Sequence, residues 1–350
     1  MSTSTSMMTA AVLGATGYVG GELLRLLSDH PEIAEVRGYS TSAAGRSWST
    51  IHPNVINRAD DPVFEAFDPA AAGRWADVVY LALPHGESQN VIEAIEDGSP
   101  RLVVDTAADF RLHDLDRFER AYGSHGRADL LGTFTTGPAD VLGHGLRGAH
   151  RVAVPGCFAT ATMLALWPLV PVLDSDSHPV CWAATGSSGS GATAKPTTHH
   201  PFRAHNFYGY SLTGHRHEAE LDERLIEWCD SDAPTCSLLT HSAPIVRGIH
   251  ATLRVRLTDP VEDPIELVHS AYAGRPFVHA LDEPPRLASV VGTNHAHVHA
   301  VARDGGRELL VLTVIDNLIK GAAGQAVQAM NLALDLPETA GLGHQGMTPC

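Results

Sequence analysis

Cys157 is the residue best placed to do chemistry in this sequence, because it lies between a Pro-Gly turn and the start of a helix. Apolar residues 152–154 end a predicted strand, Pro155 and Gly156 turn the chain, and a helix rich in small residues is predicted from Cys157 onward. The positive end of a helix dipole favours a thiolate there. A free cysteine is more often a buried core residue. That alternative is weaker here, because a glycine-rich turn precedes Cys157 and histidines follow it, a combination that suggests acyl-thioester redox chemistry.

A stretch without acidic side chains follows Cys157. No Asp or Glu occurs between Asp176 and Glu218, although the chain contains 40 of them. The interval holds six histidines together with Lys195, Arg203 and Arg216. In an acidic protein such an interval predicts a locally positive pocket for an anionic substrate. Chance exclusion of acids from a surface loop is the less favoured alternative.

His217 ends this stretch, directly before a helix predicted to run to about Trp228. A helix N-terminus biases histidine toward the neutral imidazole, which can accept a proton. His199 and His200 are candidate metal ligands, but adjacent histidines diverge and no third ligand is suitably spaced. The sequence therefore predicts no metal site.

A glycine-rich turn near the N-terminus predicts a dinucleotide site. It follows the first predicted strand and opens the first predicted helix, and its residues are Gly14, Ala15, Thr16, Gly17, Tyr18, Val19 and Gly20. Glycines permit the tight turn and let backbone N–H groups approach a pyrophosphate. A plain strand–helix turn has the same composition, but the position in a βαβ unit favours the cofactor site.

The end of the second predicted strand favours NADP over NAD. Ser40, Thr41 and Ser42 lie there with Arg46 nearby, and no acid is present to bind a ribose 2′-hydroxyl. Hydroxyls and an arginine suit the 2′-phosphate of NADP instead. Pro84 follows another strand at the same sheet edge, where a cofactor contact and a simple loop are equally well supported.

The elements that must position these residues indicate two architectures. Strands are expected at 10–13, 36–39, 77–83, 102–105, 180–184, 237–240, 250–257, 297–302 and 308–315, and helices at 20–27 and about 318–334. Strands and helices alternate up to about residue 154, which predicts an α/β, doubly wound Rossmann domain. The later strands predict an α+β domain. We expect domains at 1–156 and 157–316, with a C-terminal helical segment, 317–350, packing back on the first.

Composition excludes several classes of protein. At 350 residues the chain can hold two domains, and 44% hydrophobic residues are usual for a globular protein. The formal net charge of -16 argues against nucleic-acid binding. No apolar run reaches membrane-spanning length, and the N-terminus lacks the features of a signal peptide. The five cysteines show no regular spacing, which fits reduced thiols in a cytoplasmic enzyme.

Seven motifs together resemble the N-acetyl-γ-glutamyl-phosphate reductases, over nearly the whole chain. The motifs are GATGYVG, LALPHG, ADFRL, VPGC, GHRH, VRGI and IDNLIKGAAGQAVQAMNLAL. Those enzymes are similar in architecture to aspartate-semialdehyde and glyceraldehyde-phosphate dehydrogenases. The resemblance implies that Cys157 is the nucleophile and His217 the acid/base, and that residues 16–19 and Asn317 contact NADP. It also implies that the α+β domain is the catalytic and dimerisation domain.

A narrower resemblance concerns the substrate. The run AKPTTHHP, followed by Tyr210 and TGHRH, is similar to the lysine-pathway branch, whose substrates are aminoadipyl or glutamyl phosphates blocked by an acidic LysW-type carrier protein. The residues expected at the substrate are Arg111, Ser187, Lys195, His199, His200, Tyr210 and His215. Ser188 and Gly189 are expected at the cofactor. N–H groups of the Cys157 helix turn and of the serine loop, 187–189, are both candidates to stabilise an oxyanion. The N-acetyl substrate of arginine biosynthesis remains the alternative.

The expected partners are a small acyl phosphate, with or without the carrier protein, and further copies of the chain in a dimer or tetramer. Two other classes compete with the reductase. A non-catalytic NADP-sensing protein would not need a thiol at a helix start, and a cysteine hydrolase would not need the glycine-rich turn.

Overall fold

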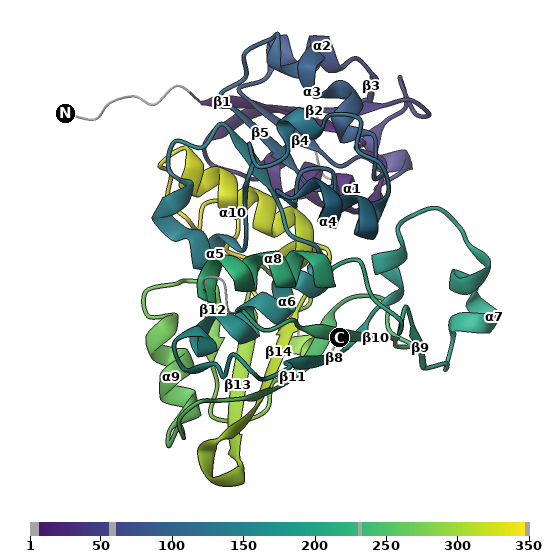
Figure 1. Cartoon of the computed structure of the whole chain (residues 1–350). Helices are drawn as coiled ribbons and strands as arrows, with labels where there is room; N and C mark the ends of the chain where they lie inside the picture. The colour runs from purple at the N-terminus through teal and green to yellow at the C-terminus, as the bar shows by residue number, and fades with distance from the viewer. Residues whose placement is uncertain (1–6, 56–60, 230–232, 347–350) are drawn as a thin grey trace.

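The computed structural model describes residues 7–55, 61–229 and 233–346 and folds them into two halves, each centred on one β-sheet (Figure 1). The N-terminal half lies at the top of Figure 1 and the C-terminal half at the bottom. Residues 1–6 and 347–350, which belong to the expected N-terminal domain and C-terminal segment, lie outside the described ranges.

The first sheet is parallel throughout, with the strand order β3-β2-β1-β4-β5-β7-β6. Its strands are β1 (Met8–Leu13), β2 (Ile33–Ser40), β3 (Glu65–Ala66), β4 (Val78–Leu81), β5 (Leu102–Asp105), β6 (Thr135–Thr136) and β7 (Arg151–Ala153). The central strands are buried apolar runs, because a parallel sheet carries helices on both faces. The predicted doubly wound sheet is confirmed.

Side chains that alternate along these strands enter two cores. Val12 and Tyr80 pack against α1 (Tyr18–Ser28) on one face of the sheet, whereas Leu13 and Val79 pack against α2 (Pro69–Trp75) and α3 (Ser88–Glu96) on the other. The shorter helices α4 (Leu115–Tyr122) and α5 (Ala139–Leu142) lie in the connection between β5 and β7. The first helix begins at Tyr18, two residues before the predicted start.

The second sheet is mixed, as predicted for an α+β half, with the order β12-β13-β14-β11-β8-β10-β9. Its strands are β8 (Val180–Thr185), β9 (Tyr208–Tyr210), β10 (Ser237–Ser242), β11 (Ile249–Arg256), β12 (Val278–Ala280), β13 (Ala296–Arg303) and β14 (Glu308–Ile315). Helix α6 (Cys157–Leu166) is apolar all round and packs against β11 and β14. Helices α8 (Glu218–Cys229) and α9 (Pro264–Ala271) flank the same core, and the short α7 (His200–Arg203) lies outside it.

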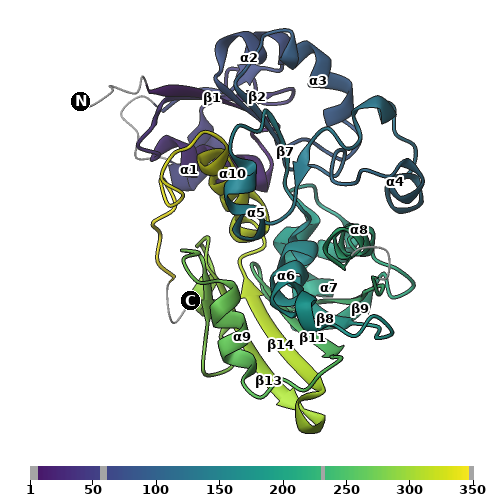
Figure 2. The ribbon, with the colours of Figure 1, turned by 60° about the vertical axis from the view of Figure 1, so that its left-hand side comes forward.

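The chain returns to the first half after β14. A π-helical turn (Ile319–Ala323) leads into α10 (Gly324–Ala333), which lies beside α1 and α5 (Figure 2). The Tyr80 hydroxyl donates to Met330 Sδ at 2.9 Å, which ties α10 to the first sheet. The sequence predicted one helix over this whole segment. A buried ion pair between Lys320 and Asp140 holds the wider first turn instead.

None of the helices in the described ranges is long and apolar enough to cross a membrane.

Candidate active site

Cys157 lies at the first position of α6, where the predicted turn places it. Gly156 is the N-cap residue, with an extended backbone (φ -61°, ψ 149°). A Cβ atom built on Gly321 would lie 2.7 Å from Cys157 Cβ, so the turn before α10 packs directly against the cysteine. The residue as a whole is partly exposed, whereas its sulfur is buried by the surrounding segments. Residues from both ends of the second half therefore meet at Cys157.

His217 lies against the same turn. A Cβ atom on Gly156 would be 2.4 Å from both Cε1 and Nε2 of the imidazole, so only glycine allows this approach. The ring is 5% exposed, and its Nδ1 has no hydrogen-bond partner among the described residues. Burial holds the pKa of His217 well below its ordinary value, and nearby His215 and Arg111 add to this effect. The ring is neutral, as predicted, although burial is the main cause.

The Cys157 thiol differs from the sequence expectation. Burial raises its pKa above the ordinary value, while Arg111, the Phe158 N–H group and Arg216 oppose the shift. Burial outweighs these groups, and since the ordinary pKa of cysteine already lies above neutrality, the thiol is the stable form at neutral pH. A neutral imidazole beside a thiol can act as the base that forms the nucleophile.

Glu220 joins the parts of this site, and sequence reasoning did not identify it. Its Oε2 accepts the Gly156 N–H at 2.8 Å, and its Oε1 accepts the Tyr122 hydroxyl at 2.8 Å and lies 3.3 Å from Arg111 Nη1. The carboxylate is 3% exposed, and Oε1 lies 4.0 Å from His217 Nε2. The available signal was its position one helical turn after His217.

Two further predicted substrate residues lie beside this centre. His215 contacts His217 edge-on with ring centroids 4.6 Å apart, and burial together with Arg216 lowers the pKa of His215 to about 4. Burial, followed by the proximity of Cys157, raises the pKa of Tyr210 to about 12. The structure thus places Arg111, His215 and Tyr210 around the pair of Cys157 and His217, and their role at the substrate stays a prediction.

The glycine-rich turn has the geometry that a dinucleotide requires. Gly14 has φ +80°, and a Cβ atom there would lie 2.3 Å from Ala82 O, so the turn is pressed against the end of β4. Gly17 is the N-cap of α1; no side chain caps it within the described residues, and its first turn carries no acid. The backbone N–H groups of this helix start can therefore bind a pyrophosphate, so this part of the chain fits the cofactor.

Only some of the groups in the loop after β2 are free to bind the 2′-phosphate. Ser40 Oγ accepts the backbone N–H groups of Ser42 and Ala43 at 3.2 Å each, so it shapes the turn. Thr41, Ser42 and Arg46 are exposed, and among the described residues no carboxylate pairs with Arg46. Three of the four predicted groups thus remain available for a ligand. Pro84 lies in the turn after β4, where its carbonyl accepts the Glu87 N–H at 3.2 Å.

Comparison with known proteins decides the family. A family model described as the semialdehyde dehydrogenase NAD binding domain matches residues 9–157, and the semialdehyde dehydrogenase dimerisation domain matches residues 157–317. An N-acetyl-gamma-glutamyl-phosphate reductase from Acidothermus cellulolyticus is 39% identical, with 97% of this chain and 98% of that protein covered. The chain belongs to the N-acetyl-gamma-glutamyl-phosphate reductase family. The predicted semialdehyde dehydrogenase-type oxidoreductase with a nicotinamide cofactor is therefore confirmed.

Further similar proteins include two relatives with different names and a more distant protein that shares the fold. A reductase of the same name from Streptomyces coelicolor is 41% identical over 97% of this chain and 99% of that protein. A protein from Thermomicrobium roseum, with the provisional name LysW-L-2-aminoadipate 6-phosphate reductase, is 37% identical over 98% and 99%. Aspartate semialdehyde dehydrogenase II from Vibrio cholerae shares the fold, with a TM-score of 0.68 at 16% identity and coverage of 93% and 98%.

Asn317 connects the serine loop to the end of β14. Its Nδ2 donates to Ser188 Oγ at 3.0 Å, and its Oδ1 accepts the Gly248 N–H at 2.7 Å. Gly189 lies next to this amide. The backbone N–H groups of Ser187 and Ser188 already donate to residues 245 and 246. These two N–H groups are therefore engaged in the protein, and the first turn of α6 is the better source of oxyanion stabilisation.

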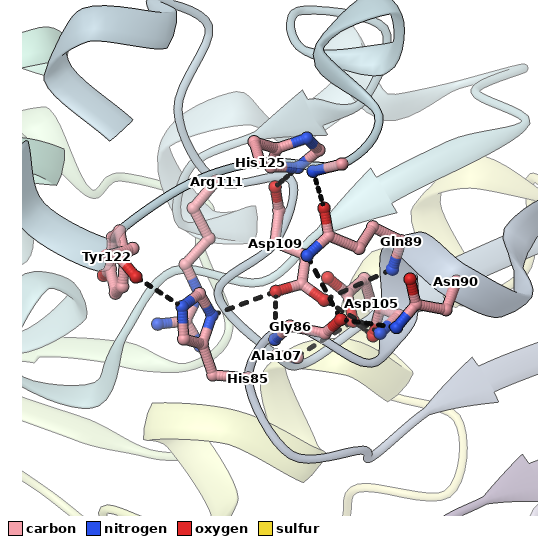
Figure 3. Close-up of polar contacts among 12 residues, drawn as sticks. His85, Gly86, Gln89, Asn90, Asp105, Ala107, Asp109, Arg111, Tyr122 and His125 are labelled. Carbon is pink, nitrogen blue, oxygen red and sulfur yellow. Dashed lines mark hydrogen bonds and ion pairs between the residues drawn. The ribbon is translucent and has the colours of Figure 1, made fainter. Parts of the chain in front are cut away.

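A buried carboxylate network anchors the loop that carries Arg111 (Figure 3). Asp109 accepts the backbone N–H of Gly86 at 2.7 Å and lies 2.9 Å from His85 Nδ1. Burial, with Asp109 nearby, raises the pKa of Asp105 to about 7. The loop that carries Arg111 is thereby tied to the loop after β4. The motif ADFRL contains Asp109, but sequence reasoning assigned this residue no role.

The remaining predicted substrate residues lie apart from this centre. Lys195, His199 and His200 are exposed on the excursion between β8 and β9, which projects from the second sheet (Figure 1). Within the described ranges, no hydrogen bond, ion pair or ring contact joins them to Cys157 or His217. Their role stays a prediction, for an outer surface of the site. No group of three His, Cys, Asp or Glu side chains in those ranges is placed to hold a metal ion.

Proposed function

We propose that this protein reduces an amino-blocked γ- or δ-acyl phosphate to the semialdehyde and phosphate, with NADPH, through a thioester on Cys157. The observation that carries the proposal is the thiol at the start of α6, with the neutral His217 ring pressed against its N-cap. Arg111 and Arg216 face the thiol and favour an anionic substrate there. The matched NAD binding domain supports the cofactor.

The chemistry then follows from the groups at the thiol. His217 accepts the thiol proton, and the Cys157 sulfur attacks the acyl carbon; the carbon–oxygen bond to phosphate breaks and a thioester forms. NADPH, when bound, supplies the hydride that reduces this thioester. The resulting oxyanion collapses: the carbonyl forms again, the carbon–sulfur bond breaks, and protonated His217 returns its proton to the departing Cys157 sulfur, which releases the semialdehyde and restores the thiol. Glu220 holds the α6 turn, Arg111 and the imidazole in this arrangement.

We propose that the two expected domains have separate roles. Residues 1–156 and the segment from 317 bind NADP, and residues 157–316 provide the reacting groups and the dimer contact. The helix start at residues 16–19 would hold the pyrophosphate, Arg46 with its neighbouring hydroxyls the 2′-phosphate, and Asn317 the cofactor near Ser188 and Gly189. The matched dimerisation domain supports a homo-oligomer.

For the amino-blocking group we propose the acidic carrier protein. Lys195, His199 and His200 form part of an exposed segment without acids, which suits an acidic macromolecule better than an enclosed small substrate. The relative from Thermomicrobium roseum supports this assignment through its name, whereas the relatives from Acidothermus cellulolyticus and Streptomyces coelicolor support the acetyl group. The net charge of -16 opposes the carrier unless positive charge is concentrated at this segment.

A steady-state assay of the reverse reaction tests both levels of the proposal. The enzyme should oxidise the semialdehyde with NADP only when phosphate is present. A sensor protein or a hydrolase would not. Carrier-linked semialdehyde should give the higher kcat/KM, and added salt should reduce that advantage, since salt screens steering. Equal, salt-insensitive use of the N-acetyl compound would assign the protein to the arginine branch.

A further inference from the structure

Arg203 is a buried arginine without a carboxylate partner. Its side chain lies at the end of α7 and is 8% exposed. Within the described residues no Asp or Glu lies at ion-pair distance from it, and its Nε has no hydrogen-bond partner. By contrast, the buried Arg224 pairs with Glu227 and Glu223. A buried guanidinium without a counter-ion is costly. The burial of Arg203 therefore indicates that its counter-ion is an anionic ligand.

The contacts of Arg203 do not explain its burial. Among the described residues, one of its five N–H donors reaches an acceptor, the Thr185 carbonyl, at a long 3.4 Å. Thr185 ends β8 directly before the serine loop and is paired in register with Ser242 of β10. The Ser242 hydroxyl is also buried and has no partner in the described part of the chain. The Arg203 guanidinium and the Ser242 hydroxyl, which both carry donors without a partner in the described ranges, are thus both adjacent to Thr185 at the end of β8.

Arg203 lies near the same tyrosine, Tyr210, as the catalytic thiol. The Tyr210 hydroxyl senses both groups, because Cys157 contributes to the raised pKa of Tyr210 while Arg203 and Arg216 oppose it. Tyr210 also contacts His215 with ring centroids 6.1 Å apart. Arg203 therefore lies on the β9–β10 side of the site, whereas Arg111 approaches from the first half of the chain.

We propose that Arg203, together with the Ser242 hydroxyl, forms an oxyanion subsite for the substrate. This inference rests on the proposed function, whose substrate carries two oxyanions: the phosphoryl group that leaves and the α-carboxylate that remains. A planar guanidinium binds either group through paired hydrogen bonds. Whether Arg203 binds the phosphoryl group or the carboxylate, it should tighten substrate binding. In the reverse reaction the first assignment makes phosphate binding depend on Arg203, and the second makes semialdehyde binding depend on it.

The test compares Arg203→Met and Arg203→Lys in the full-length protein. In the reverse reaction, loss of a charge-assisted contact should raise one KM on the order of ten- to a hundred-fold, with a smaller rise for the lysine variant and kcat largely retained. A raised KM for phosphate assigns the phosphoryl group, and a raised KM for the semialdehyde assigns the carboxylate. Arg307→Met is the matched control, since Arg307 is exposed and likewise donates to a carbonyl, that of Thr258.

A second readout does not depend on turnover. Inorganic phosphate and glutarate serve as probes that protect Cys157 from alkylation by iodoacetamide. Protection by one of them should be weaker in Arg203→Met than in the wild type. Equal behaviour of the two proteins toward both probes, or unchanged KM values with a lowered melting temperature, would overturn the subsite and leave Arg203 a structural residue. Absence of phosphate-dependent oxidation in the wild type would instead refute the proposed function.

Discussion

The substitution Gly156→Ala tests whether His217 acts at the Cys157 turn. The new methyl group would lie 2.4 Å from two atoms of the imidazole, against about 3.5 Å for an ordinary contact, so the ring must retreat by about 1 Å. A misplacement of this size costs on the order of 100-fold in rate, or about 2.7 kcal/mol in the barrier. The backbone at φ -61° accepts alanine, so the fold should persist.

The assay is kcat for phosphate-dependent semialdehyde oxidation, together with NADPH affinity by fluorescence and the melting temperature. Gly145→Ala is the matched control, because a Cβ atom there meets nothing within 4 Å, and it should behave as wild type. In a His217→Asn background, Gly156→Ala should cost less than about threefold, since both changes remove the same contribution. A wild-type kcat for Gly156→Ala, or the same 100-fold loss in both backgrounds, would refute the argument.

Three further predictions address the thiol and the cofactor. Cys157→Ser should abolish turnover while NADPH affinity stays within about twofold, because a hydroxyl does not readily form the acyl-enzyme; near-normal activity would exclude the covalent route. Burial raises the pKa of Cys157, so its alkylation rate, followed by peptide mass spectrometry, should rise with pH from 7 to 9. A plateau that persists down to pH 6 would reveal a thiolate paired with charged His217 instead. Arg46→Ala should raise KM for NADP on the order of ten- to a hundred-fold and leave KM for NAD unchanged, provided that Arg46 binds the 2′-phosphate.

Much of the fold was predictable because its signals are local. The β1–α1 glycine turn and the Pro155-Gly156 stop before α6 depend on residues adjacent in the chain, and the structure places both where the sequence predicted. Buried strands such as β5 and β14 begin and end at the predicted residues, since apolar runs bounded by polar residues are read directly. The last helical segment lies close to its predicted bounds, but its π-helical start, which depends on tertiary packing, was not predicted.

The sequence by itself determined where the candidate nucleophile, the histidine before α8 and the glycine-rich turn lie, because each is defined by its neighbours along the chain. Only the tertiary structure decided the state of these groups. Burial sets the pKa of Cys157 and of His217, and burial depends on segments more than 50 residues apart in sequence. Glu220 acquires its role by meeting the Gly156 turn across the fold. The acid-free stretch is divided for the same reason: Lys195 is exposed to solvent, whereas Arg203 is buried and has no counter-ion among the described residues.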